Sequence, residues 1–340
     1  MNETVGASLG EIRTLLKNLP APDEAAAAAA AAREKALTKP EGSLGLLEGL
    51  CEWFVSWQGR NPPRLERPRV AVFAGNHGVT RHGISAYPPE VTAQMVANFQ
   101  AGGAAVNQLC QLYDAELRIY EMALDHPTAD FTEAAALSEE ECASAMAYGM
   151  MAVEDGIDAV CLGEMGIGNT TSAAALCCAL FGGEARDWTG PGTGVADSAL
   201  TRKVEAVAAG LDCHREHLDD PFEVLRRLGG HELAAITGAV IAARIGGVPV
   251  ILDGYAATAA AAVLHKIDST ALDHCIVGHL SAEPAHGRLL ECLGKAPLLD
   301  LNMRLGEASG AVMALGVLRG AIACHTGMAK FEEAQVSEKL

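Results

Sequence analysis

The sequence predicts an α/β fold, a Rossmann-like parallel sheet with helices on both faces. Short apolar runs end at glycine or aspartate, and stretches with helical spacing follow them. Continuous apolar strands that alternate with helices are typical of a parallel sheet buried on both sides. Half of the 340 residues are hydrophobic, but only 4% are aromatic. The core must therefore be packed from alanine, valine, leucine and isoleucine.

Residues 1–60 are expected to form helices. In the first helix, apolar residues recur at helical spacing, at Leu9, Ile12, Leu16 and Leu19. Asp23 is an N-cap candidate for the alanine-rich run that reaches Leu37. Leucines at positions 44, 47 and 50 mark a third helix. The alanine run is interpreted as a helix with a small-residue face rather than as a linker.

From Arg69 onward the pattern indicates strands that lead into helices. The predicted strands are Val70–Ala74 before Gly75, Glu116–Met122, Ala159–Leu162 before Gly163, Val248–Leu252 before Asp253-Gly254, and Ile276-Val277 before Gly278. Residues 170–180 and the glycine-interrupted stretch 305–323 are expected to be helical. Beyond Lys330 the chain is charged and is expected to fray. Ligands of parallel sheets bind at the carboxyl ends of the strands, where these glycines fall.

Composition limits the partners and the compartment. The net charge of -18 opposes binding to nucleic acid or anionic lipid, so neither is expected as a partner. The ten cysteines include no C-x-x-C pair and lie mostly in apolar stretches, which indicates buried, reduced thiols in a cytoplasmic protein. The N-terminus lacks the pattern of a signal peptide, and the apolar run 256–264 is too short to span a bilayer.

The stretch Gly163–Ser172, Gly-Glu-Met-Gly-Ile-Gly-Asn-Thr-Thr-Ser, lies between a predicted strand and a predicted helix. Its glycines let the backbone approach a ligand, and free N–H groups at a helix start bind phosphate. It is not a Walker loop, because the one Gly-Lys pair of the sequence is followed by Ala296, and it lacks the dinucleotide fingerprint. An anion site and a plain tight turn both remain open on this evidence.

Two further loops offer polar groups at predicted strand or helix ends. Gly190–Gly194, Gly-Pro-Gly-Thr-Gly, is a second glycine loop, and Lys203 follows it. A lone lysine is more often a solvated surface charge than a ligand contact. Ser281 follows a predicted strand and offers a hydroxyl donor to a sugar or phosphate oxygen, with the carboxylate of Glu283 close by.

For other side chains, a purely structural role is at least as well supported as a role in ligand binding. The loop Gly83–Pro89 carries Ser85 and Tyr87 and either walls a flat ligand or only orders the strand exit. His279 and His286 are not spaced for a helical i, i+4 metal pair. We interpret both histidines as structural, and no metal site is predicted.

Glu307 is a single acid in an apolar, glycine-rich segment, residues 303–310. It is either paired structurally with a base such as Arg304 or tuned for proton transfer. Desolvation would raise the pKa of its carboxyl toward that of a weakly basic heteroaromatic nitrogen. The residues alone do not separate these two interpretations.

Seven segments in a fixed order carry a resemblance to a known family. They are Lys39–Gly45, Ser85–Pro88, Gly163–Thr171, Gly190–Gly194, Asp253–Ala260, Ser281–Pro284 and Arg304–Glu307. Together they resemble the nicotinate-nucleotide–dimethylbenzimidazole phosphoribosyltransferases, the cobamide lower-ligand enzymes. The resemblance implies a homodimer whose subunit has a large α/β domain, residues 61–304, and a small helical domain, residues 1–60 with part of 305–340.

The resemblance also implies a reaction. Nicotinate mononucleotide donates its phosphoribosyl group to a nitrogen of 5,6-dimethylbenzimidazole or a related base, with inversion at the anomeric carbon. Nicotinate leaves and α-ribazole 5′-phosphate forms. The donor's pyridinium ring is already a good leaving group, so neither a metal nor an organic cofactor is expected. Glu307 matches the catalytic base, and Glu164 matches a second acid that would stabilise the developing ribosyl cation.

The resemblance and the glycine loops together assign the remaining site residues. Nucleotide and phosphate binding is assigned to Gly166, Gly168, Asn169, Thr170, Gly192, Gly194, Lys203 and Ser281. The pocket for the aromatic base is assigned to Ser85, Tyr87, Met165 and Leu305. Asn76, Ala285 and Ala308 depart from the family pattern, where Asp, Gly and Gly are common. The departures concern loop detail and base preference, so no preferred base is predicted.

Two other classes of protein compete with the transferase. A non-catalytic carrier or sensor of a mononucleotide needs the glycine loops but has no use for Glu307. An NAD-dependent oxidoreductase is disfavoured because the dinucleotide fingerprint is missing. Nicotinate release that requires both a mononucleotide and a base separates the transferase from either rival.

Overall fold

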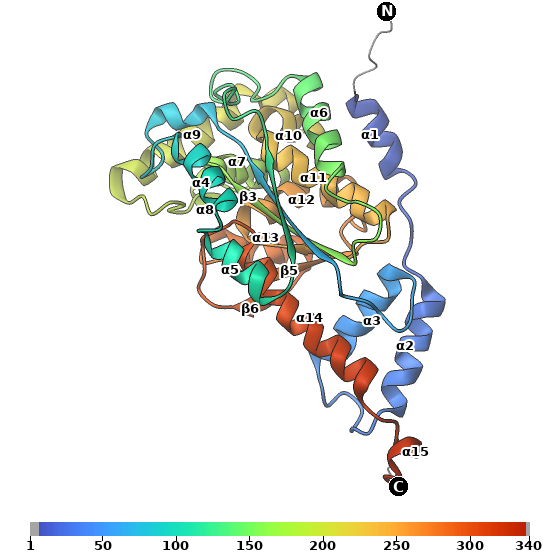
Figure 1. Cartoon of the computed structure of the whole chain (residues 1–340). Helices are drawn as coiled ribbons and strands as arrows, with labels where there is room; N and C mark the ends of the chain where they lie inside the picture. Colours follow the sequence, from blue (N-terminus) through green and yellow to red (C-terminus); the bar gives the residue numbers. More distant parts are fainter. Residues whose placement is uncertain (1–6, 338–340) are drawn as a thin grey trace, which may run out of the picture.

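The computed structural model describes residues 7–337. A six-stranded sheet lies at its centre, with strand order β2-β1-β3-β4-β5-β6 and every neighbouring pair parallel (Figure 1). The strands are β1 Pro68–Ala74, β2 Glu116–Glu121, β3 Ala159–Met165, β4 Val250–Leu252, β5 Cys275–Leu280 and β6 Pro297–Asp300. The order reverses between β1 and β3, and ligands of doubly wound sheets bind at the carboxyl side of such a switch point.

Helices cover both faces of this sheet, as the sequence predicts. They are α1 Leu9–Leu16, α2 Glu24–Ala36, α3 Leu46–Gln58, α4 Val91–Gln100, α5 Ala105–Leu112, α6 Glu139–Met150, α7 Asn169–Phe181, α8 Ala185–Trp188, α9 Asp197–Cys213, α10 Pro221–Leu228, α11 His231–Ile245, α12 Tyr255–Ile267, α13 Ala285–Leu293, α14 Ser309–Gly327 and α15 Phe331–Ala334, with 3₁₀ helices η1 Gly78–His82 and η2 Arg215–His217. Successive strand residues alternate between two cores: Ala71 and Phe73 pack under α6, α7, α11 and α12, whereas Val70 and Val72 pack under α3, α5 and α14.

The two ends of the described chain have different partners. The predicted cap of the alanine-rich helix is confirmed, because the Asp23 carboxylate accepts from the Ala26 amide at 2.8 Å. Figure 1 shows α2, α3 and the far end of α14 extending together away from the sheet. Arg33 ties them by donating to the His325 carbonyl at 2.6 Å. By contrast α1, which the sequence groups with these helices, packs on α6.

Two predicted strand ends are wrong, for one physical reason. β3 continues past Gly163 to Met165, and β5 continues past Gly278 to Leu280. A Cβ on Gly163 would collide with the Ala308 backbone, and one on Gly278 would lie 2.7 Å from the Ala311 Cα. These glycines do not form turns; they let the start of α14 pack directly on the sheet.

Other sequence expectations had mixed outcomes. Strand β6 was not predicted, because its residues are only partly buried or, at Asp300, exposed, and carry little periodic signal. In the tail past Lys330, residues 331–334 form the short helix α15 instead of fraying, and residues 338–340 lie outside the described part of the chain. All ten cysteines are free, and most are buried, although Cys213 and Cys292 are exposed. Among the described helices, α14 alone is long and apolar enough to span a membrane, but it packs on α3, α5 and β5 as a core helix does.

Candidate active site

A cleft of about 540 Å³ opens at the carboxyl ends of the strands, beside the switch point between β1 and β3. It gathers almost all the residues that the sequence assigns to the site: Ser85, Tyr87, Glu164, Met165, Gly166, Gly168, Asn169, Thr170, Gly192, Lys203, Ser281, Leu305 and Glu307. Gly194 is the exception, since it lies exposed outside the lining and its amide donates to the Pro191 carbonyl at 3.0 Å. Segments more than 200 residues apart in the sequence therefore meet in one cavity.

The start of α7 forms one wall of the cleft. Gly168 is the residue before the helix and has a left-handed backbone, with φ of 98°, and no side chain caps the helix. A Cβ there would lie 2.8 Å from the Thr80 methyl group, so both conformation and space favour glycine. Within the described residues, the amides of Gly168 and Thr170 have no backbone or side-chain acceptor. These free donors at the positive end of a helix dipole are suited to an anion.

Lys203 is buried in the same wall, so the surface-charge interpretation is wrong. Its Nζ donates to the Thr170 hydroxyl at 2.7 Å and to the Gly190 carbonyl at 2.9 Å. Burial lowers the pKa of this amine to about 8. A Cβ on Gly192 would lie 2.6 Å from the Thr170 hydroxyl and 2.7 Å from the amine. The second glycine loop thus packs against the buried cation and the first turn of α7.

Glu283 and Arg304 hold the loop around Gly192 from both sides. The Gly192 amide donates to the Glu283 carboxylate at 2.8 Å, and Arg304 donates to the Gly192 carbonyl at 2.9 Å. The second carboxylate oxygen of Glu283 is buried without a partner in the described structure. Arg304 bonds this loop, and the Glu307 Oε2 atom is buried without a hydrogen-bond partner, so the ion pair considered between the two residues does not form within the part of the chain that the structure describes.

Glu164 lies near the end of β3 and is partly exposed to the cleft. Its carboxylate accepts a hydrogen bond from the Asn169 amide group. Burial, followed by the nearby negative charge of Asp253, raises the pKa of Glu164 to about 8. A carboxyl group at this position keeps its proton to higher pH than an exposed one, and a cationic ligand would favour its ionisation.

Glu307 lies on a strained turn directly before α14. Its φ is 62°, and the next residue, Ala308, has φ of 61°. Non-glycine residues in this region cost about 1–3 kcal/mol each and cluster at functional sites. The Glu307 amide donates to the Glu164 carbonyl at 3.1 Å, so the two acids are adjacent. The side chain is 4% exposed and burial raises its pKa to about 7, near the range of a general base.

A buried polar chain supports the floor of the cleft. His77 Nε2 contacts the Glu232 carboxylate at 2.6 Å, and its Nδ1 contacts the Ser172 hydroxyl at 3.1 Å. Gly166 packs beside it: a Cβ there would lie 3.5 Å from His77 Nε2 and 2.5 Å from the Gly75 carbonyl. These contacts connect the end of β1 to the first turn of α7 and to α11.

The loop after η1 forms the outer wall. The Thr193 hydroxyl accepts from the Ala86 amide at 3.0 Å and contacts the Ser85 hydroxyl at 3.1 Å. Tyr87 and Leu305 are each 56% exposed at the mouth, where they offer apolar surface to a flat ligand. The alternative that this loop only orders the strand exit does not account for its place in the cleft lining.

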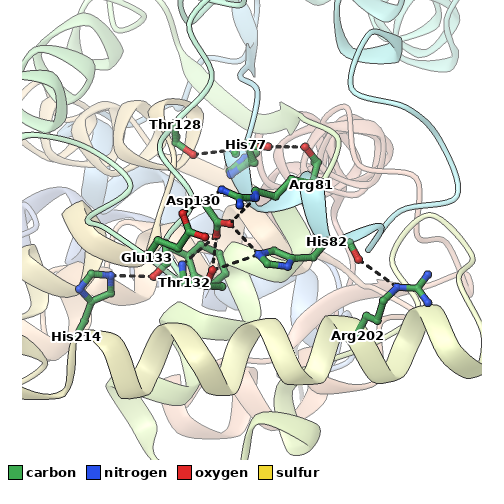
Figure 2. A network of polar contacts seen from close by, with 12 residues as sticks. His77, Arg81, His82, Thr128, Asp130, Thr132, Glu133, Arg202 and His214 are labelled. Atoms are coloured by element: carbon green, nitrogen blue, oxygen red, sulfur yellow. Dashed lines mark hydrogen bonds and ion pairs between the residues drawn. The ribbon is translucent and has the colours of Figure 1, made fainter.

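Figure 2 shows the polar network that fixes η1 behind this loop. His82 Nε2 contacts the Asp130 carboxylate at 2.7 Å, and Arg81 donates to Glu133 at 3.0 Å. Arg202 of α9 donates to the carbonyls of His82 at 3.1 Å and Gly83 at 2.9 Å. These bonds fix the position of the loop that carries Ser85 relative to α9, the helix that carries Lys203.

The two histidines differ in their contacts, and only the ring of His286 forms hydrogen bonds within the described residues. His286 accepts from the Ser281 amide at 2.9 Å and contacts the Thr258 hydroxyl at 3.2 Å. His279 lines the cleft and lies 3.8 Å from the Asp253 carboxylate. Within residues 7–337, no group of three or more His, Cys, Asp or Glu side chains is placed to hold a metal ion.

Several cleft residues were not assigned from the sequence. They are Ile84, Val91, Met95, Ile167, Thr193, Gly254, Tyr255, Ala256, His279, Glu283, Arg304 and Gly306. Arg304 and Glu283 stand inside motifs already singled out, so position in a motif was a usable signal for them. Val91 and Met95 come from α4, and nothing in their sequence spacing distinguishes a cleft face from a core face.

A cleft of this kind, at the switch point of a doubly wound sheet, places the chain among α/β enzymes that act on phosphorylated small molecules. The model of the family described as Phosphoribosyltransferase matches residues 19–336, and the chain therefore belongs to that family.

Named relatives and a solved structure agree with this membership. The nicotinate-nucleotide–dimethylbenzimidazole phosphoribosyltransferase of Rhizobium etli is 57% identical over 334 residues, covering 98% of each chain. A protein of the same name from Methylocella silvestris is also 57% identical over 98% of each chain. The crystal structure of the Thermus thermophilus enzyme matches with a TM-score of 0.85 and 38% identity, covering 93% of this chain and 100% of that one.

Proposed function

We propose that this chain transfers the phosphoribosyl group of nicotinate mononucleotide to a nitrogen of 5,6-dimethylbenzimidazole or a related lower-ligand base. The products are α-ribazole 5′-phosphate and nicotinate, and the reaction serves assembly of the cobalamin nucleotide loop. Relatives at 57% identity over nearly the whole chain support the reaction. The observation that carries the assignment of roles is a pair of adjacent acids with raised pKa that line the same cleft as an uncapped helix start.

The phosphate of the donor would bind at the start of α7. The free amides of Gly168 and Thr170 supply donors, and the Lys203 amine lies on the Thr170 hydroxyl beside them. A bound dianion would favour the charged form of Lys203. This buried cation compensates for a protein surface that is otherwise strongly negative.

The reaction would proceed between the two acids. The bond from C1′ to the nicotinate nitrogen breaks while the bond from C1′ to the acceptor nitrogen forms. Glu164 would stabilise positive charge on the ribosyl group, and Glu307 would take the ring N–H proton of the acceptor. Nicotinate then leaves with the electron pair of the broken bond. Tyr87, Met165 and Leu305 would hold the flat acceptor beside Ser85.

The proposal extends to the setting of the enzyme. We expect a cytoplasmic homodimer with a small helical domain formed by residues 1–60 and part of 305–340 and a large domain formed by 61–304. Within residues 1–60, α2 and α3 pack on each other, whereas α1 packs on α6 of the large domain. The free cysteines suit a reducing compartment. The net charge of -18 argues against nucleic acid and anionic membranes as partners.

Product analysis by mass spectrometry tests this function. The purified chain is incubated with nicotinate mononucleotide and a mixture of candidate bases, and each reactant is omitted in turn. We expect nicotinate and an α-ribazole 5′-phosphate only when both reactants are present. Tight binding of the mononucleotide by calorimetry, with no product from any base, would favour a non-catalytic nucleotide-binding protein instead.

A further inference from the structure

Asp253 stands at the carboxyl end of β4 and is fully buried, although it is not part of the roles given above. One oxygen of its carboxylate accepts from the amides of Gly310 at 2.7 Å and Ala311 at 2.9 Å. Both amides belong to the first turn of α14. A carboxyl oxygen that accepts two backbone N–H groups at a helix start caps that helix. The two bonds favour the ionised form, but burial outweighs them and raises the pKa of Asp253 to about 7.

The same helix start is pressed onto the sheet on both sides of β4. On β3, a Cβ at Gly163 would collide with the backbone of Ala308. On β5, a Cβ at Gly278 would lie 2.7 Å from the Ala311 Cα, and a Cβ at Gly310 would collide with the His279 ring. Contact from both neighbouring strands and a bond from the central one leave this turn little freedom to shift.

The restraint matters because the turn before α14 is strained. Gly306, Glu307 and Ala308 all have positive φ, and two of the three are not glycine. Conformations of this kind persist only where surrounding contacts over-determine them. The bonds from Asp253 hold the residues immediately after the turn, and the amide of Glu307 is held by the Glu164 carbonyl before it.

We propose that Asp253 is a positioning residue for Glu307: its carboxylate fixes the first turn of α14 and so holds the strained turn that aims the Glu307 side chain at the acceptor base. The proposal rests on the proposed function. It assigns Asp253 no contact with substrate, and it predicts a loss in kcat without a matching change in mononucleotide binding, because the Asp253 side chain bonds the first turn of α14 and makes no hydrogen bond to α7.

Three variants test the assignment in the full chain: Asp253→Ala, Asp253→Asn and, as a matched control, Asp23→Ala, which removes the cap of the distant helix α2. Steady-state nicotinate release gives kcat and the KM for nicotinate mononucleotide, and circular dichroism gives the folded fraction. We expect Asp253→Ala to lose about 100-fold in kcat, the scale of a 1 Å misplacement, with KM changed less than about threefold. Asp253→Asn keeps an acceptor oxygen and should lose only about tenfold.

The outcomes are separable. Asp23→Ala should keep wild-type kcat despite a lost cap. A wild-type kcat in Asp253→Ala, or an equal loss in the Asn and Ala variants, would overturn the assignment. If Asp253→Ala does not fold, Asp253→Asn decides, and a wild-type kcat there overturns it. Failure of the wild-type chain to release nicotinate would instead overturn the proposed function, independently of Asp253.

Discussion

The two helices that begin at the cleft, α7 and α14, start in different ways. Gly168 precedes α7 and has a left-handed backbone at no steric cost, and no side chain caps the first amides. Ala308 precedes α14 and has the same left-handed backbone conformation, which costs free energy because alanine, unlike glycine, carries a Cβ. The amides of Gly310 and Ala311 are already bonded to Asp253. Of these two helices, only α7 therefore keeps free donors for a ligand.

The difference assigns a separate task to each helix. The uncapped dipole of α7 favours a negative ligand, and we propose the donor phosphate as that ligand. At α14 the amides of the first turn are already bonded to the Asp253 carboxyl. Burial raises the pKa of Glu307 to about 7, so the residue is suited to accept a proton near neutral pH.

Removing the carboxylate of Glu307, next to α14, should cause the largest loss in kcat. Glu307→Gln keeps the size and polarity of the side chain but cannot take the acceptor proton. We expect kcat to fall by up to about 10⁴-fold, the upper range for a general base, with little change in the KM for nicotinate mononucleotide. Nicotinate release measures both values, and near wild-type turnover would remove Glu307 from the role of base.

Removing the carboxylate of Glu164 should lower kcat by a smaller factor. Glu164→Gln removes the charge expected to stabilise the ribosyl cation while keeping an acceptor for Asn169. We expect a loss of about 10²-fold in kcat, as for removal of one electrostatic stabiliser of a transition state. The loss should persist with benzimidazoles of different basicity. A loss that follows acceptor basicity would instead assign the proton transfer to Glu164.

A change beside α7 should weaken the binding of nicotinate mononucleotide. Lys203→Met preserves the buried stem but removes the cation beside Thr170. A hydrogen bond to a charged group contributes about 1.5–3 kcal/mol, so the KM for nicotinate mononucleotide should rise at least about tenfold. Lys17→Met, at the exposed end of α1, serves as the control and should behave as wild type. An unchanged KM in Lys203→Met would place the phosphate elsewhere.

The smallest expected effect is on stability. Burial raises the pKa of Glu307 to about 7 and of Glu164 to about 8, from 4.5. Because the folded state binds these protons more tightly, their stabilising contribution is complete below pH 4.5 and is lost as pH rises through 7 to 8. At pH 8.5, Glu307→Gln without ligand should therefore melt several degrees above wild type. Scanning calorimetry should show that the difference vanishes near pH 4.5, and an equal shift at both pH values would contradict the assignment.

Much of the fold followed from pattern alone. The apolar runs before Gly75 and Asp253 predicted two strands of a buried parallel sheet, and Asp23 predicted a helix cap. The role of each glycine could not be predicted from the sequence, because glycine can either form a turn or make room for close packing. Gly168 supplies a left-handed turn, whereas Gly163 lies inside a strand and makes room for α14. The difference depends on a helix nearly 150 residues away in the chain, which local pattern does not encode.

The site shows the same limit. Lys203 has no local sign of burial, since its environment comes from Thr170 and Gly190 in other segments. Glu307 was identified from its apolar, glycine-rich neighbours, but those neighbours did not decide between an ion pair with Arg304 and a free acid. The contact that decides it is the bond from Arg304 to Gly192, over 100 residues away in sequence.

The most direct test of the account is a crystal structure of the Glu307→Gln variant with nicotinate mononucleotide and 5,6-dimethylbenzimidazole bound. We predict that the 5′-phosphate lies within hydrogen-bond distance of the Gly168 and Thr170 amides, with the side chain at position 307 facing a ring nitrogen of the acceptor. A phosphate bound away from α7, or an acceptor out of reach of position 307, would contradict the division of tasks between the two helices.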